Sequence, residues 1–237
     1  MVLIALQRAL GSSAPAAAET LARMSDNESL APAEREQLAQ LAALAGSQAA
    51  YAKLDCLLEL LRQHPDKMVI FTQFRATQEL LDRELRAAGF SVVSFHGGLK
   101  RLEKEAAVET FRRQAQLLVC TESGSEGRNL QFAHAVCNFD LPWNPMKIEQ
   151  RIGRLSRIGQ ARDVHVYNLV AEHTVEEAIL HLLEAKLNLF ELVIGEIDMI
   201  LGNSDDDREF EDIVTDLWSE SADHDDRLFG DRFTPQG

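Results

Sequence analysis

The sequence has 237 residues, of which 46% are hydrophobic and 26% are charged. These proportions are close to the globular average, which argues against a disordered or collagen-like chain. No run of about 18 apolar residues occurs, so the sequence predicts no membrane-spanning helix. The three cysteines lie far apart and form no CxxC pair, so they encode neither a disulfide framework nor a zinc site. We therefore expect a reduced, cytoplasmic protein that binds no metal and no membrane.

The net charge of −14 is unevenly distributed along the chain. Residues 196–237 contain 14 acidic and 3 basic residues, a net charge of −11. Residues 64–170 contain 12 acidic and 15 basic residues, so this part of the chain is mildly basic. An acidic tail says little about the ligands of a separate basic body. The negative net charge of the whole chain is therefore no argument against nucleic-acid binding.

The first 50 residues are rich in alanine, and we interpret residues 1–50 as a helical linker. Pro32 occupies a first-turn position, and apolar residues recur at helical spacing over 33–45. A second helix is predicted over 51–63, where four leucines share one face.

From Lys67 onward, short apolar runs alternate with helical patterns. The runs predict strands that are buried on both faces of a parallel sheet. This alternation predicts an α/β fold, a parallel sheet with helices on both faces. In such sheets, ligands bind at the loops that follow the carboxyl ends of the strands. The strands are predicted at 68–71, 91–95, 117–120, 135–139 and 164–169, and the helices at 77–88, 100–113 and 147–158.

The end of the chain reads as a long helix followed by an acidic tail. Thr174 can cap the helix, and Glu177 completes a capping box. The pattern stays apolar as far as Leu201, so we assign residues 171–201 to a C-terminal brace helix. Residues 202–237 are acidic and contain few large apolar side chains, so we expect a partly disordered tail.

The densest chemical signal is the basic segment from Gln150 to Gln160. Arginines three residues apart on a helix project to nearly the same side, which would bring Arg154 and Arg157 together. Two guanidinium groups that converge are suited to binding a polyphosphate. A solvated basic helix face is the alternative interpretation.

Three further loops follow predicted strands. Residues 121–130 contain two glycines, which allow a backbone to approach a ligand closely. Residues 139–145 contain two prolines and Trp143, which either stacks on a base or anchors the loop. His96 and Gly97 precede a helix whose first N–H groups could hold a phosphate, although a structural histidine is the alternative.

Taken together, these segments resemble the second RecA-like lobe of superfamily 2 helicases, and among them the SWI/SNF-type ATPases, closest to the bacterial RapA-like branch. Residues 69–74 (VIFTQF) look like motif IV and residues 121–130 (TESGSEGRNL) like motif V. Residues 140–145 (DLPWNP) match the D-x-x-W-N-P segment, and residues 150–160 (QRIGRLSRIGQ) match motif VI. The resemblance covers residues 51–170, which we interpret as the lobe itself.

This resemblance implies a role for each matching residue. Arg154 and Arg157 would be arginine fingers that reach the γ-phosphate of ATP. Gln150 would either position the attacking water or help to transmit nucleic-acid contact to the site. Residues expected to approach the nucleotide are Glu126, Gly127 and Asn129. Residues expected to line a nucleic-acid track are Thr72, Gln73, His96, Gly97, Trp143 and Asn144.

Two motifs that ATP hydrolysis requires are missing from the sequence. It contains neither a G-x-x-x-x-G-K-[ST] loop nor an Asp-Glu dipeptide, so it offers no phosphate cradle and no magnesium carboxylate. We expect the isolated chain to be inactive, with Mg²⁺ bound by a first lobe that is encoded upstream, lies on another chain or is missing. The leading hypothesis is one half of an ATP-driven translocase on double-stranded DNA or another nucleic acid. The alternative is a non-catalytic remnant that binds nucleic acid or RNA polymerase.

Overall fold

The fold is built on a five-stranded sheet. In the computed structural model the described residues are 2–49, 51–121, 130–142, 145–155, 163–172, 174–177 and 179–180. The strands are β1 (Met68–Thr72), β2 (Val92–Phe95), β3 (Leu117–Thr121), β4 (Ala135–Asn138) and β5 (His165–Asn168). The helices are α1 (Val2–Ser12), α2 (Ala14–Ser25), α3 (Pro32–Gly46), α4 (Ala52–Gln63), α5 (Arg75–Ala87), α6 (Arg101–Arg113) and α8 (Pro145–Gly153).

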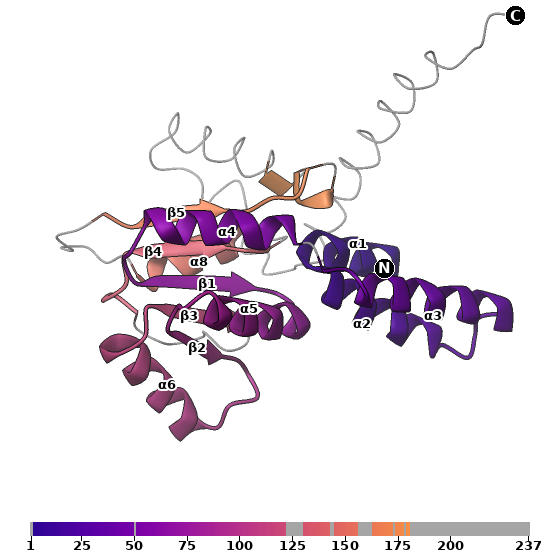
Figure 1. Cartoon of the computed structure of the whole chain (residues 1–237), viewed down its shortest axis with the longest axis horizontal. Coiled ribbons are helices and arrows are strands. Elements are labelled where there is room, and N and C mark those ends of the chain that lie inside the picture. Colours follow the sequence, from indigo (N-terminus) through magenta and orange to yellow (C-terminus); the bar gives the residue numbers. More distant parts are fainter. Residues whose placement is uncertain are drawn as a thin grey trace, which may run out of the picture.

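The sheet is parallel throughout, in the strand order β2-β3-β1-β4-β5 (Figure 1). The central strands β1 and β3 are buried along their whole length, as their continuous apolar runs predict. Strand β5 is an edge strand and is more exposed. All five predicted strands are therefore confirmed, with small shifts at their ends.

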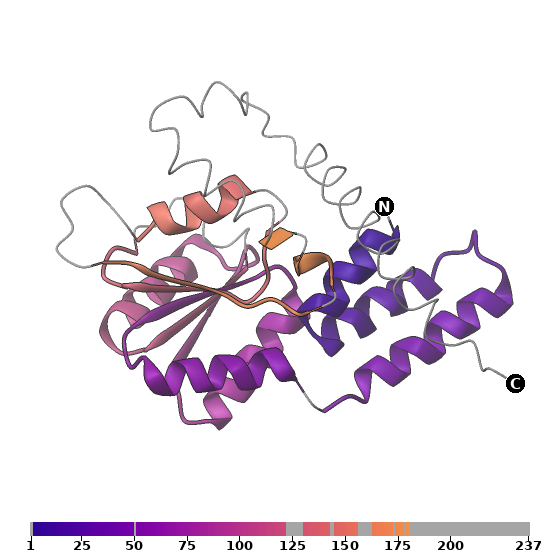
Figure 2. The same ribbon diagram turned by 90° about the horizontal axis from the view of Figure 1, so that it is seen from above.

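Two apolar cores cover the two faces of the sheet. Successive side chains in a strand point to opposite faces, so neighbouring strand residues enter different cores. Ile70 faces α4 and α5, where it joins Leu57 and Leu81. Its neighbour Phe71 faces the opposite side, where it joins Phe111 of α6. Figure 2 shows the sheet with α4 (purple) on one side and α8 (salmon) on the other. The predicted parallel sheet with helices on both faces is thus confirmed.

Helices α1 and α2 lie in residues 1–50, for which the sequence predicts a helical linker without the bounds of these two helices. They lie with α3 at one side of the sheet (Figures 1 and 2). The Ser13 side chain caps α2 by accepting a hydrogen bond from the Ala16 N–H at 3.2 Å. The hydroxyls of Ser12 and Ser13 lie 2.6 Å and 2.7 Å from the Thr77 hydroxyl, and these contacts join α1 and α2 to α5.

The predicted helix over 147–158 is confirmed over 147–153, and residues 156–158 lie outside the described residues. Helix α8 begins at Pro145 and ends at Gly153. Arg154 and Leu155 follow in a turn, where the Arg154 N–H donates to the Arg151 carbonyl at 3.3 Å. Glycine is a poor helix former, and the Arg154 carbonyl accepts from the Leu130 N–H at 3.1 Å, outside any helix. The argument that Arg154 projects from a continuous helix is therefore incorrect.

Of the predicted C-terminal brace helix, the structure describes only the beginning. The Thr174 hydroxyl accepts a hydrogen bond from the Glu176 N–H at 3.2 Å, so Thr174 caps this turn as predicted, although the partner is Glu176. Residues 181–237, with the rest of the predicted brace helix and the acidic tail, lie outside the described residues. Over the part of the chain that is described, no helix is long and apolar enough to cross a membrane.

Candidate functional site

Several of the predicted site residues lie at the carboxyl edge of the sheet. Thr72, the last residue of β1, is in register with Thr121, the last residue of β3. Phe95, the last residue of β2, is in register with Cys120. His96 therefore leaves the sheet at the edge where Thr72 ends β1. This arrangement agrees with the expectation that ligand-binding residues follow the strands at this edge.

Thr72 and Gln73 are held by Asp140, which follows β4. The Thr72 hydroxyl donates to Oδ2 of Asp140 at 2.5 Å, and the Gln73 N–H donates to the same oxygen at 2.8 Å. Thr72 is fully buried, so its hydroxyl faces Asp140 and not solvent. Its role in the structure is therefore to fix the end of β1, which differs from the predicted contact with nucleic acid.

The Gln73 side chain joins three parts of the chain. Its amide nitrogen donates to the Leu141 carbonyl at 2.5 Å. Its amide oxygen accepts a hydrogen bond from Nη2 of Arg8 on α1. Gln73 thus connects the end of β1 both to the segment after β4 and to the first helix, which sequence reasoning did not predict.

His96 and Gly97 begin the turn between β2 and α6. His96 is partly buried, and Gly97 is exposed. Burial lowers the pKa of the His96 imidazole, and the nearby charge of Arg75 lowers it further. Because the pKa of His96 lies below the ordinary value of 6.5, the ring is neutral at neutral pH. A neutral ring suits a hydrogen-bonding role more than a cationic one.

Arg75 is a candidate residue that sequence reasoning missed. It begins α5 directly after motif IV, and its side chain is 47% exposed. Nη1 donates to Oε1 of Gln78 at 2.7 Å, and Nε donates to Glu79 at 3.1 Å. Arg75 could have been predicted as a site residue from its position, because it comes directly after Gln73-Phe74 at the end of a strand. Arg75 places an exposed positive charge at the same edge as His96.

The motif VI residues that are described take different positions. Gln150 is exposed on α8, and Arg154 is partly buried in the turn after that helix. The positive charges of Arg151 and Arg154 both act on the Cys120 thiol at the end of β3, where burial raises the thiol's pKa. Arg154 therefore lies near the carboxyl edge of the sheet, beside the start of the predicted motif V loop.

Arg151 is a structural arginine that sequence reasoning counted only as one charge of a basic segment. Its side chain is buried, and its guanidinium carbon lies 4.8 Å from the centre of the Phe71 ring. Nη1 donates to Oδ1 of Asn138 at 2.5 Å and to the Asp140 carbonyl at 3.4 Å. Arg151 thereby ties motif VI to the ends of β1 and β4.

Half of the predicted site residues lie outside the described residues. They are Glu126, Gly127 and Asn129, Trp143 and Asn144, and Arg157. Their roles stay predictions.

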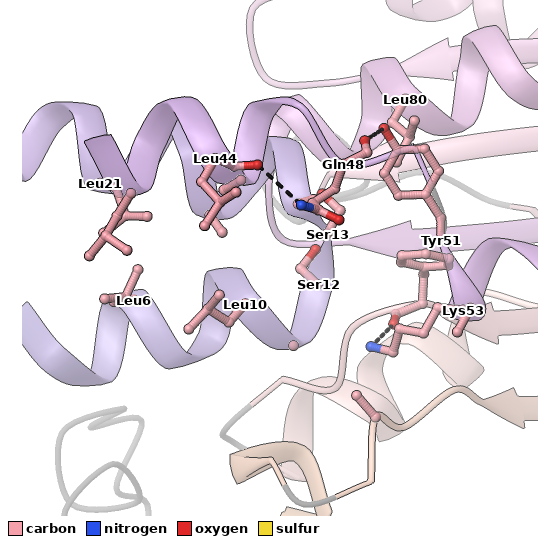
Figure 3. Close-up of a pocket in the computed structure, with 18 residues that line it drawn as sticks. Leu6, Leu10, Ser12, Ser13, Leu21, Leu44, Gln48, Tyr51, Lys53 and Leu80 are labelled. Carbon is pink, nitrogen blue, oxygen red and sulfur yellow. Dashed lines mark hydrogen bonds between the residues drawn. The ribbon is translucent and has the colours of Figure 1, made fainter. Parts of the chain in front are cut away.

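A large apolar hollow lies elsewhere in the molecule, between the N-terminal helices and the sheet (Figure 3). Its volume is about 540 Å³, and leucines of α1 and α3 form much of its wall. Leu10 and Leu44 line it and are 58% and 59% exposed. Within the described part of the chain, none of the predicted site residues lines this hollow, but Lys53 and Phe139 do, and they lie next to Asp140.

The comparisons with known proteins match part of this chain to one domain family. The family model described as the helicase conserved C-terminal domain matches residues 52–159. This chain carries a helicase C-terminal domain. The match begins at α4 and ends within motif VI, so helices α1 to α3 lie outside it.

Its relatives among curated proteins include a protein named as a helicase and a protein named as RNA polymerase-associated. An uncharacterized ATP-dependent helicase, YqhH of Bacillus subtilis, is 46% identical over 201 residues, which cover 84% of this chain and 36% of that protein. The RNA polymerase-associated protein RapA of Vibrio vulnificus is 38% identical over 154 residues, which cover 61% of this chain and 16% of that protein. The chain thus spans only about a third or less of the length of these relatives.

Solved structures show the same fold. The C-terminal part of the Fun30 ATPase domain superposes with a TM-score of 0.54 at 22% identity, covering 84% of this chain and 74% of that one. The Escherichia coli DEAD-box protein SrmB superposes with a TM-score of 0.50 at 26% identity, covering 58% of this chain and 78% of that one. The RecA-like fold and the predicted resemblance to the SWI/SNF-type and RapA-like helicases are confirmed.

Proposed function

We propose that this chain supplies the second lobe of a nucleic-acid-dependent ATPase that translocates along double-stranded DNA or another nucleic acid. The observation that carries the proposal is the shared carboxyl edge of β1, β2 and β3, where motif IV, His96 and Arg154 lie. A helicase lobe needs nucleic-acid contacts and phosphate contacts side by side, because the two ligands must be coupled during each cycle.

Arg154 and Arg157 would stabilise the negative charge that develops on the phosphates of ATP during transfer. This role is electrostatic, since a guanidinium can hold two phosphate oxygens at once. Gln150 would orient the attacking water, and Glu126, Gly127 and Asn129 would approach the nucleotide. The described residues fit the phosphate-binding part of this role, because Arg154 brings a cation to the edge of the sheet.

ATP supplies the phosphoanhydride whose hydrolysis drives the cycle. Mg²⁺ would be held by the first lobe, which carries the phosphate-binding loop and the carboxylates that this sequence lacks. On this proposal residues 51–170 form the lobe, residues 1–50 and 171–201 flank it, and residues 202–237 form an acidic tail. Hydrolysis requires a first lobe, and the isolated chain is inactive.

For nucleic-acid binding, the carboxyl edge of the sheet would contact the sugar-phosphate backbone of the nucleic acid more than its bases. Arg75, Gln73 and His96 lie after strand ends, where they can meet phosphates and sugars, and Gly97, Trp143 and Asn144 complete the predicted track. Such contacts carry little sequence information. Because Thr72 is buried, its contribution is indirect, through the position of Gln73.

The alternative is a non-catalytic remnant that binds nucleic acid or RNA polymerase. The similarity to a protein named as RNA polymerase-associated is the observation in its favour. Arg154, at the carboxyl edge of the sheet, favours the ATPase, since a module that only binds needs no arginine directed at a nucleotide.

Salt dependence of duplex binding tests the nucleic-acid part of the proposal. If the chain neutralises about six phosphates, affinity should fall roughly a thousandfold between about 50 and about 200 mM salt. Changing the base sequence of the duplex should alter affinity little. A flat salt response, or binding to one sequence alone, would contradict this assignment.

A further inference from the structure

Three buried charges meet beside the candidate site, outside the predicted site residues. Lys53 lies in the first turn of α4, Asp140 follows β4, and Glu176 lies in the turn capped by Thr174. Their side chains are only 11%, 3% and 5% exposed. Buried charges are expensive unless they are paired and hydrogen-bonded, so this cluster needs an explanation.

Lys53 is the centre of the cluster. Its ammonium lies 2.6 Å from Oε2 of Glu176 and 3.8 Å from Oδ1 of Asp140. It also donates to the Phe139 carbonyl at 2.7 Å, a bond drawn in Figure 3. Lys53 therefore contacts the segment that follows β4 twice, at the Phe139 backbone carbonyl and at the Asp140 side chain.

Glu176 is fixed from two other directions. Its Oε2 accepts a hydrogen bond from the Ala171 N–H at 3.1 Å. A Cβ added to Gly11 of α1 would lie 3.3 Å from Cδ of Glu176, so α1 packs tightly against the carboxyl group. Burial raises the pKa of Glu176 to about 7, and Asp140 adds to the increase while Lys53 opposes it. The pair thus joins α4, α1 and the segment after β5 in one place.

The cluster reaches the candidate site through Asp140. Oδ2 of Asp140 holds the Thr72 hydroxyl and the Gln73 N–H, and the Asp140 carbonyl accepts from Arg151. A buried ion pair adds little net stability, because desolvation cancels most of the attraction. Its directional bonds nevertheless fix where Phe139 and Asp140 lie, and so where motif IV ends.

We infer that Lys53 and Glu176 are positioning residues: they hold the 139–142 segment and, through Asp140, set the Gln73 backbone in the geometry that binds nucleic acid. The inference rests on the proposed function for its nucleic-acid consequence. The conformational part stands independently, because it concerns only the segment that the pair grips. Neither residue touches the ligand; both act through Asp140.

The experiment compares Lys53→Met, Glu176→Gln and the double variant with the wild-type chain, at a pH above 7 where Glu176 is ionised. The control is Lys67→Met. Lys67 is also partly buried and donates to two carbonyls, those of Phe111 and Ala115, but lies apart from Asp140. All variants are first shown to be folded by urea unfolding curves.

Two readouts are taken from each variant: duplex DNA affinity, and acrylamide quenching of Trp143 in a Trp218→Phe background. Trp143 follows Pro142 directly, so its emission reports on the segment independently of nucleic-acid binding. Lys53→Met should weaken affinity about tenfold and change the quenching constant about twofold, and the double variant should be no worse because the two residues act as one unit. Lys67→Met should lower stability and leave both readouts unchanged.

The inference is overturned if folded Lys53→Met matches the wild-type chain in both readouts, or if Lys67→Met changes them equally. If the wild-type chain does not bind duplex DNA at all, the proposed function fails. Trp143 quenching then decides the positioning role alone: a change confined to Lys53→Met and Glu176→Gln supports it, and no change overturns it.

Discussion

Arg8 of α1 donates a hydrogen bond from Nη2 to the Gln73 side-chain oxygen, which joins the first helix to the end of β1. The two residues are 65 positions apart, and Arg8 lies outside the residues matched by the helicase family. The hydroxyl contacts between Ser12, Ser13 and Thr77 extend the same junction onto α5. The N-terminal helices are therefore fastened to the residue that we propose to contact nucleic acid.

Arg8→Ala should destabilise the junction. A hydrogen bond to a charged group contributes about 1.5–3 kcal/mol, so we expect the free energy of unfolding to fall by about 2 kcal/mol in urea titrations. The control is Arg23→Ala on α2, because Arg23 is exposed and its contact with a described residue is a long one, 3.4 Å to the Thr20 hydroxyl. Equal effects of the two substitutions would contradict the importance of the Arg8–Gln73 bond.

Gln78 should be one of the most sensitive positions beneath the site. It is buried, and its amide nitrogen donates to the carbonyls of Phe95 at 3.0 Å and Val119 at 2.7 Å. Gln78→Leu would leave both carbonyls without this donor, so we expect a loss of about 2–4 kcal/mol in the free energy of unfolding. Urea unfolding monitored by circular dichroism measures the change.

The matched control for this substitution is Gln63→Leu at the exposed end of α4. Among the described residues Gln63 bonds only to Glu59 on the same helix, so its loss should change stability by less than about 0.5 kcal/mol. A Gln78 variant as stable as the Gln63 variant would show that the buried amide does not hold β2 and β3 to α5.

The stability of the chain should depend on pH through Glu176. Its pKa rises from an ordinary value of 4.5 to about 7 on folding, mainly because the carboxyl is buried. Between these values the folded chain holds a proton that the unfolded chain releases, so this contribution is present below pH 4.5 and is lost as the pH rises through 7. Relative to Glu176→Gln, the wild-type chain should lose up to about 3 kcal/mol across that interval.

Thermal or urea unfolding of both proteins at a series of pH values measures the difference. Glu172→Gln serves as the control, because Glu172 is exposed in the same segment. A stability difference between the wild-type chain and Glu176→Gln that stays constant with pH would contradict the raised pKa.

The sheet could be predicted because each buried strand is a continuous apolar run, as in residues 68–72 and 117–121. The bounds and packing of helices α1 and α2 could not be predicted, although the segment was expected to be helical. Their buried residues include the small Ala16 and Ala17, and α2 docks on α5 through hydroxyl contacts at Thr77. Neither feature produces the periodic pattern of large apolar residues on which helix prediction depends.

Of the candidate site, only the residues that belong to recognisable sequence motifs could be predicted. Gln73 and His96 were found by resemblance, and the strand ends place them together. The sequence did not distinguish the two arginines of α8 and the following turn: Arg151 is buried beneath Phe71, whereas Arg154 is partly exposed. Burial is decided by tertiary packing, which charge spacing alone does not encode. The same holds for the Lys53–Glu176 pair, whose members are 123 residues apart.

The most direct measurement of the central claim is ATP turnover stimulated by duplex DNA, with this chain joined to a first lobe that carries a phosphate-binding loop. Arg154→Ala is compared with Arg62→Ala, since Arg62 is 64% exposed on α4 and, within the described part of the chain, pairs only with Glu59. An arginine finger contributes about 10³–10⁵ to turnover, so Arg154→Ala should abolish stimulated hydrolysis while Arg62→Ala retains it. Turnover that is unchanged by Arg154→Ala would contradict the composite ATPase and favour a non-catalytic binding module.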